Sequence, residues 1–263
     1  MRKPKGSVNL GRIIAVANQK GGVGKTTTAV NLSAALALCG KKVLLADVDP
    51  QGHATTSCGI GKKTLGATVY EVLIGEAKIG DAIVRTPDGK PDVLPATVDL
   101  AGAELELTSL DSREFRLRNA LNLVRGDYDY IIIDSPPALG LLNLNGLVAA
   151  DAVLVPLQTE FFALDGLSQL MATIRLVRRG PNPALDLEGV LLTMYNSQLN
   201  LTNQVAAEVK KFFPHKVFKT VIPRTVRLSE APGFGKDIFE YDRRSKGADA
   251  YMELAKEILK NDR

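Results

Sequence analysis

Eight consecutive residues near the N-terminus combine glycines, lysines and hydroxyl side chains at a spacing that suits phosphate binding. Glycines in such a turn let backbone N–H groups converge on phosphate oxygens, and the N-terminus of a following helix adds positive potential. Lys25 would contact the terminal phosphates of a nucleotide, and the Thr26 hydroxyl would ligate Mg²⁺. The segment lies between an apolar run at 13–17 and a helical pattern, and it consists of Lys20, Gly21, Gly22, Val23, Gly24, Lys25, Thr26 and Thr27.

This segment departs from the ordinary phosphate loop at one position. The pattern G-x-x-x-x-G-K-[ST] has a glycine five residues before Gly24, where this chain has Gln19. The next residue, Lys20, is a second lysine that ordinary phosphate loops lack. The strand and helix that the motif requires are both expected around it, which argues against a chance glycine-rich turn.

Aspartates stand at the ends of two other apolar runs. Asp47 and Asp49 close the run at 43–48, and Asp134 closes the run at 130–134. Ligands of open α/β sheets bind beyond the carboxyl ends of the strands, so these carboxylates are expected near the phosphates. Carboxylates after the first run could orient an attacking water or hold metal-bound waters, and Asp134 fits a group that reaches Mg²⁺ directly or through water.

The segment after Asp134 has the composition of a switch loop. Residues 135–140 contain two prolines and a glycine, and they begin where a γ-phosphate would lie. We expect the triphosphate to order this loop and hydrolysis to release it. No glutamate follows Asp134 where a strong general base would stand, so the sequence predicts a slow hydrolase whose site something else completes.

Apolar runs alternate with helical patterns, which predicts an α/β fold: a single three-layer domain with a mostly parallel sheet and helices on both faces. Several runs are nearly continuous in Val, Ile and Leu, as in strands buried on both faces. The segment 52–89 is interpreted as loop-rich surface with a short helix near 70–74. The expected strands are 13–17, 43–48, 92–94, 130–134, 152–157, 189–194 and 217–222, and the expected helices are 27–39, 113–124, 141–149, 164–178, 201–213 and 248–259.

The length and composition suit a globular α/β protein. The chain has 263 residues, 45% hydrophobic and 24% charged, and no linker stands out. We therefore expect a flexible basic tail at 1–11 and one phosphate-loop domain at 12–263. The tail lacks the apolar segment of a signal peptide, and no apolar stretch is long enough to span a bilayer. Cys39 and Cys58 show neither metal-ligand spacing nor a disulfide framework, which favours a reducing, cytoplasmic location.

Positive charge is concentrated in the C-terminal part of the chain. Between Val209 and Lys246 there are ten Lys and Arg against four Asp and Glu, a net charge of +6, whereas the whole chain carries +4. The remainder is therefore slightly acidic. A polyanion-binding surface is expected in this C-terminal region.

These motifs resemble those of the ParA/MinD group of ATPases, whose phosphate loop is called a deviant Walker A motif. The C-terminal stretch looks like the chromosomal ParA branch of that group, also called Soj. The resemblance extends from Ile13 to about Lys260. Its matching segments are Lys20–Thr26, Asp47-Val-Asp-Pro-Gln51, Ile133-Asp-Ser-Pro-Pro137, Val221–Pro232, Tyr241-Asp242 and Gly247-Ala248.

The resemblance implies roles for individual residues. Lys20 would be the signature lysine that reaches across an ATP-bound dimer to the partner's phosphates, and Asp49 would position the hydrolytic water. Pro223 and Thr225 would lie near the adenine, although the family commonly has Asn in place of Thr225. The implied catalytic residues are Lys20, Lys25 and Asp49; the nucleotide site is Lys20–Thr27 with Pro223 and Thr225; the Mg²⁺ ligands are Thr26 and Asp134.

The resemblance also implies partners. Arg224 corresponds to a family arginine implicated in DNA binding, and Arg227, Lys219, Lys236 and Arg243 could extend that patch. ATP would drive homodimerisation, the dimer would bind double-stranded DNA non-specifically on the nucleoid, and a ParB-type centromere-binding protein would stimulate hydrolysis and release. Such DNA binding would depend strongly on salt. No stable membrane association is expected.

Two other classes share the phosphate loop. A membrane-associated regulator like MinD needs a C-terminal amphipathic helix. Here Tyr251, Leu254, Ala255, Ile258 and Leu259 form an apolar stripe of the kind that more often packs on a core. A reductase like the nitrogenase iron protein needs cysteines that bridge a metal cluster, and the two cysteines of this chain do not fit that arrangement.

Overall fold

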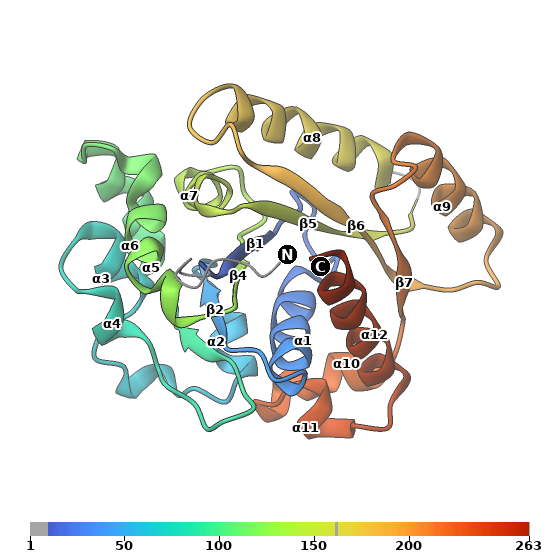
Figure 1. The fold of residues 1–263 in the computed structure, drawn as a ribbon, viewed down its shortest axis with the longest axis horizontal. Helices are drawn as coiled ribbons and strands as arrows, with labels where there is room; N and C mark the ends of the chain where they lie inside the picture. Colours follow the sequence, from blue (N-terminus) through green and yellow to red (C-terminus); the bar gives the residue numbers. More distant parts are fainter. Residues whose placement is uncertain (1–9, 161–162, 263) are drawn as a thin grey trace, which may run out of the picture.

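Seven parallel strands form one sheet in the order β3-β2-β4-β1-β5-β6-β7 in the computed structural model, which describes residues 10–160 and 163–262 (Figure 1). All seven predicted strands are confirmed. The central ones are buried on both faces, as their continuous apolar sequences indicate. The strands are β1 (Arg12–Val16), β2 (Val43–Asp47), β3 (Asp92–Leu94), β4 (Tyr130–Asp134), β5 (Ala152–Gln158), β6 (Asp186–Tyr195) and β7 (Val217–Pro223).

Helices cover both faces of the sheet and enclose two hydrophobic cores (Figure 1). One core lies under α1, α11 and α12, and the other lies under α3–α9. The predicted single α/β domain with helices on both faces is therefore confirmed. The helices are α1 (Lys25–Leu38), α2 (His53–Ser57), α3 (Val69–Ile74), α4 (Ile79–Ala82), α5 (Leu100–Glu106), α6 (Arg116–Val124), α7 (Leu141–Ala149), α8 (Ala163–Arg179), α9 (Asn200–Phe212), α10 (Val226–Glu230), α11 (Ile238–Asp242) and α12 (Lys246–Asn261).

The six predicted helices are confirmed, but the interpretation of 52–89 needs correction. This segment holds α2, α3 and α4 rather than one short helix, and α5, α10 and α11 were also not expected. Each of these has four to seven residues, too few for an apolar period of 3.6 to repeat. Local capping identifies some of them instead: α3 begins at a capping box in which Thr68 and Glu71 satisfy each other's backbone amides.

The apolar stripe of the C-terminal helix α12 is buried inside the molecule. Tyr251, Leu254, Ala255 and Ile258 are at most 1% exposed. The helix packs against α1, where the Tyr251 hydroxyl lies 3.2 Å from Oγ1 of Thr28. The spacing of the stripe therefore indicated core packing correctly, and the apolar face is not available to a membrane surface.

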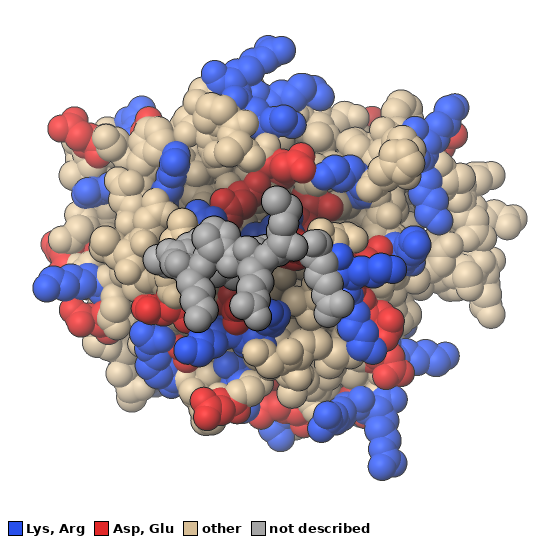
Figure 2. All heavy atoms as spheres, viewed as in Figure 1, with Lys and Arg blue, Asp and Glu red and all other residues tan. Residues whose placement is uncertain are grey.

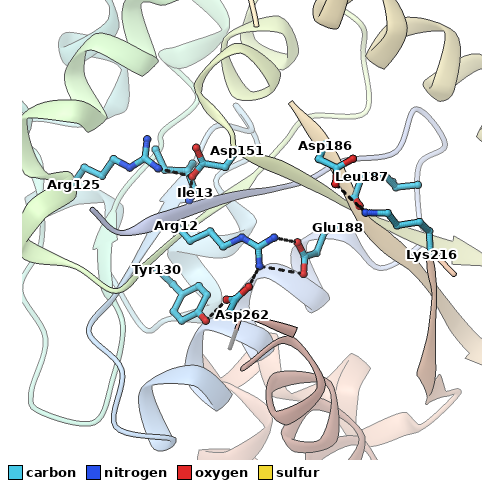
Figure 3. Close-up of polar contacts among 10 residues, drawn as sticks. All are labelled: Arg12, Ile13, Arg125, Tyr130, Asp151, Asp186, Leu187, Glu188, Lys216 and Asp262. Carbon is cyan, nitrogen blue, oxygen red and sulfur yellow. Dashed lines mark hydrogen bonds and ion pairs between the residues drawn. The ribbon is translucent and has the colours of Figure 1, made fainter. Parts of the chain in front are cut away.

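Charged side chains join the N-terminal ends of several strands. Acidic groups gather near the centre of the face shown in Figure 2, with basic groups beside them. In Figure 3, Arg12 at the start of β1 pairs with both Glu188 on β6 and Asp262 after α12, and Asp262 also accepts a hydrogen bond from the Tyr130 hydroxyl on β4. This network ties the end of the chain to three strands of the sheet.

Arg12→Ala is expected to lower the free energy of unfolding by about 2–3 kcal/mol, because it leaves the Glu188 carboxylate, whose side chain is 3% exposed, without its cation. Burial raises the pKa of Glu188 and Arg12 opposes that shift, so the variant should raise the pKa further. A carboxyl with a raised folded-state pKa loses stability as pH rises, so the loss should be larger at pH 8 than at pH 5.

Urea denaturation of wild type and Arg12→Ala at the two pH values measures this effect. Arg179→Ala is the matched control, because Arg179 is exposed and forms no ion pair with the described residues. A destabilisation that is equal at pH 5 and pH 8 would contradict the role given to Glu188.

Candidate active site

The phosphate loop has the backbone geometry that an anion site requires. Gly22 and Gly24 have φ values of 73° and 88°, in the left-handed region that residues with a Cβ rarely adopt. Gly24 is the N-cap of α1 and provides no side-chain cap, and the first turn of α1 contains no acidic residue. The first amides of α1 are therefore left for an anion, as the sequence predicts.

Neighbouring strands hold this loop in place. The Asn18 side chain accepts a hydrogen bond from the Lys20 amide (3.0 Å) and donates one to the Pro156 carbonyl at β5 (2.7 Å). From β6, the Thr193 hydroxyl donates to the Val23 carbonyl (2.8 Å). Nothing in the sequence motif identifies Asn18 or Thr193, although polar residues at the ends of apolar strands are the signal that could have found them.

Lys25 lies at the bottom of the site and is 7% exposed. Its Nζ donates to the Lys20 carbonyl at 3.1 Å. Burial lowers its pKa, and the charges of Asp134 and Asp49 oppose that effect. A buried ammonium between carboxylates and a loop of free amides is well placed to receive the phosphates of a nucleotide.

Asp134 lies beside the loop with its carboxylate completely buried. It pairs in register with Asp47 on β2 and Val16 on β1, so three strand ends meet here. Neither of its oxygens accepts a hydrogen bond of normal geometry from the described residues. Burial, and then the charge of Asp47, raise its pKa well above the usual range, while Thr26 and Lys25 oppose the shift. A buried carboxylate without partners beside a threonine hydroxyl fits Mg²⁺, which prefers oxygen ligands.

The two aspartates at the end of β2 have different environments. Asp47 is buried and accepts hydrogen bonds from the amide (2.8 Å) and hydroxyl (2.7 Å) of Thr55, and burial raises its pKa to about 6. The Thr55 hydroxyl in turn accepts from the Ala96 amide (2.9 Å). Asp49 is partly exposed, and one of its oxygens accepts only from the amide of Gln51. Asp49 is therefore the carboxylate that a water molecule can reach, whereas Asp47 ties β2 to α2.

A cavity of about 480 Å³ adjoins the phosphate loop on the side of β7. The structure brings Pro223 and Thr225 together here with Gly24 and Thr27, as a base-binding role requires. The Thr225 hydroxyl is engaged as the N-cap of α10, where it accepts from the Leu228 amide. Its O–H hydrogen and its methyl group remain available to a base. The other lining residues are Thr193, Met194, Ile222, Arg224, Val226, Leu228, Ser229, Pro232 and Tyr251.

The five basic residues predicted to bind DNA differ in whether acidic side chains of the protein already pair with them. Arg227 is already neutralised by Glu230 (3.2 Å) and Asp242 (3.4 Å). Arg224 is exposed at the base cavity, and Lys236 lines a smaller cavity with Thr26 and Thr27. Lys219, Arg224, Lys236 and Arg243 are exposed and make no ion pair with the described residues, so they are the stronger candidates.

The strands and loop together define a P-loop nucleotide-binding domain. A family model described as an AAA domain matches residues 11–187. The protein is also similar in structure to the cobyrinic acid a,c-diamide synthase of Mycobacterium smegmatis with bound ADP and magnesium (TM-score 0.84, 43% identity, 96% of this chain and 95% of that one). It is similar to the cell division ATPase MinD of Pyrococcus furiosus as well (TM-score 0.80, 28% identity, 96% and 100%).

Relatives of similar length identify the family within this class of P-loop domains. The sporulation initiation inhibitor protein Soj of Bacillus subtilis is 57% identical over 96% of this chain and 100% of its own length. The chromosome partitioning protein ParA of Caulobacter vibrioides is 52% identical over 98% and 97%. The chain therefore belongs to the ParA/Soj family of chromosome-partitioning P-loop ATPases, and MinD is a more distant likeness. None of the described helices is long and apolar enough to cross a membrane.

Asp134→Asn is expected to stabilise the ligand-free protein and to weaken its response to Mg²⁺ and ATP. The raised pKa means that wild-type stability falls as pH rises, because the unfolded chain releases this proton more readily than the folded one. The variant lacks that penalty, so it should melt about 3–6 °C higher than wild type at pH 8, with a smaller difference at pH 5.

Thermal melts with and without Mg-ATP measure both effects, with the exposed Asp165→Asn as the control for net charge. A ligand-free variant that melts below wild type at pH 8, or that keeps the full Mg-ATP shift, would contradict the role given to Asp134.

Proposed function

We propose that this protein is a chromosome-partitioning ATPase in which ATP drives homodimerisation and the dimer binds double-stranded DNA without sequence preference. The observation that carries the proposal is the phosphate loop with a second lysine, Lys20, in a chain 57% identical to a Soj protein. Identity to the structure named as a cobyrinic acid a,c-diamide synthase is lower, at 43%. The proposal therefore follows the partitioning relatives.

The nucleotide site supports slow hydrolysis. The amides at the start of α1 and Lys25 would bind the phosphates, and Thr26 and Asp134 would hold Mg²⁺, which neutralises phosphate charge when bound. Asp49 would orient the attacking water. Among the described residues close to Lys25, the charges that act on it are those of Asp134 and Asp49, and the former is reserved for the metal. One partly exposed carboxylate gives a weak site, which a ParB-type partner would complete.

Lys20 accounts for dimerisation in this scheme. It lies at the rim of the loop with 39% of its side chain exposed, whereas Lys25 is buried. A rim lysine can reach the phosphates of a second copy of the chain placed face to face with the first. ATP would then be shared across the interface, and its hydrolysis would loosen the dimer.

The exposed basic residues of the C-terminal half support DNA as the partner. A non-specific DNA surface needs unpaired cations, and Lys219, Arg224, Lys236 and Arg243 supply them. The apolar stripe of α12 is buried, which removes the main support for a membrane-bound regulator like MinD. The proposed location is the cytoplasm, on the nucleoid.

Binding of a labelled random-sequence duplex, with ATP and with ADP across a salt series, tests this function. We expect tight binding only with ATP, and a steep loss with salt. Arg224→Ala should weaken binding and reduce the slope of log K against log salt by about 1, as expected for the loss of one phosphate contact. The matched Arg227→Ala should have a smaller effect, because Glu230 and Asp242 already neutralise that arginine. Binding that is equal with both nucleotides, or binding to anionic vesicles instead of DNA, would refute the proposal.

Asp49→Ala is expected to abolish most ATP turnover and to leave a long-lived ATP dimer that still binds DNA, because it removes the water-positioning group while Lys20, Lys25 and Thr26 stay in place. Size-exclusion chromatography with light scattering and a phosphate-release assay measure the two properties. Lys25→Ala, which should not bind ATP productively, is the negative control. An Asp49→Ala protein that hydrolyses ATP at the wild-type rate would show that another residue orients the water.

A further inference from the structure

The Lys20 side chain has a partner within its own protomer. Its Nζ forms an ion pair with Oε2 of Glu160 at 2.5 Å, and Glu160 follows the end of β5. The second carboxylate oxygen of Glu160 accepts a hydrogen bond from the Gln158 side chain on the same strand. Both oxygens of Glu160 are therefore engaged, and the sequence motifs gave no reason to expect this residue in the site.

The backbone of Lys20 is held by two hydrogen bonds, whereas its side chain is held only by the ion pair with Glu160. The amide donates to Asn18 and the carbonyl accepts from Lys25, so the position of the residue in the loop is set from both sides. Lys20 and Glu160 keep 39% and 47% of their side chains exposed. The lysine can therefore turn outward about its own side-chain bonds without disturbing the phosphate loop.

We infer that Glu160 is a positioning residue that retains Lys20 within its protomer and yields it when a partner's triphosphate competes for it. This inference rests on the proposed function, in which Lys20 acts across the dimer. The single charge of Glu160, in solvent, is a weak competitor for a lysine compared with a triphosphate. The ion pair thus adds a free-energy threshold to dimerisation: it must be broken before Lys20 can bind the partner's phosphates, which weakens the dimer without preventing it.

The size of the threshold follows from exposure. Ion pairs between exposed side chains change equilibrium constants by about two- to fivefold. Removing the Glu160 charge should therefore shift the ATP-dependent monomer–dimer equilibrium toward the dimer by about that factor. The effect must vanish when Lys20 is absent, because Glu160 acts only through it.

A double-mutant cycle in the slowly hydrolysing Asp49→Ala background tests this coupling. Light scattering at increasing protein concentration with saturating Mg-ATP would give the dimerisation constant for Glu160→Gln, Lys20→Ala and the double variant. Glu160→Gln should tighten the dimer about two- to fivefold with Lys20 present, and it should not strengthen or restore the dimer that Lys20→Ala weakens. Glu208→Gln on α9 is the charge-matched control, since Glu208 is exposed and forms no ion pair among the described residues. Equal effects in both Lys20 backgrounds, or a weaker dimer with Glu160→Gln, would overturn the inference.

Carbodiimide crosslinking separates the ion pair from the proposed function, because it joins an amine to a carboxylate in contact and needs no dimer. Mass spectrometry should find a Lys20–Glu160 crosslink in the nucleotide-free protein, and its yield should fall when Asp49→Ala is loaded with ATP. If the nucleotide-free protein gives no crosslink, the inference about Glu160 is overturned and the proposed function is not. A protein that crosslinks but stays monomeric with ATP overturns the proposed function and, with it, the release of Lys20.

Discussion

A carboxylate buried at the end of the central strand β4 governs the arrangement of the whole site. Asp134 has no described hydrogen-bond partner of normal geometry, and Asp47 lies beside it on β2. Burial raises the pKa of both carboxyls, and the charge of Asp47 raises that of Asp134 further, so the pair destabilises the folded state when both are charged. Lys25 offsets part of this repulsion from the start of α1, and a bound divalent cation would offset more. The fold thus keeps an electrostatically unfavourable pair of carboxyls beside the loop that is proposed to bind phosphates.

The two ends of the sheet illustrate this contrast. At the N-terminal ends of the strands, Arg12, Glu188, Asp262 and Tyr130 satisfy one another in a closed network (Figure 3). At the C-terminal ends, the free amides of α1 and the oxygens of Asp134 are left without protein partners among the described residues. The paired charges at the N-terminal ends of the strands stabilise the folded chain without a ligand. The unpaired groups at the C-terminal ends favour the binding of a charged ligand.

The sequence was sufficient for the strands and long helices, because their apolar patterns repeat over enough residues to be recognised. It was also sufficient for the phosphate loop, whose glycines are required by φ values near 73° and 88°. The strand pattern alone could not distinguish Asp47 from Asp49, and only the family resemblance did, since their physical difference depends on Thr55, which lies in α2 eight residues after Asp47. The partner of Lys20 escaped prediction for the same reason, because the fold brings Glu160 to it from the end of β5. The pairing of Arg227 is partly local: Glu230 stands three residues further on in α10, a helix too short to be predicted, whereas Asp242 belongs to α11.

The position of α12 constrains how a change at the nucleotide can be transmitted. Its apolar residues pack on α1, the helix that begins with Lys25, so the C-terminal helix shares one hydrophobic core with the helix that follows the phosphate loop. An output that required α12 to leave the core would expose Tyr251 and its neighbours to water, at a cost of several kcal/mol. A change in the partner of one exposed lysine costs far less. In the proposed function, ATP would therefore act through rim charges such as Lys20, which would alter assembly and bring basic surfaces together, and not by unfolding an element of the core.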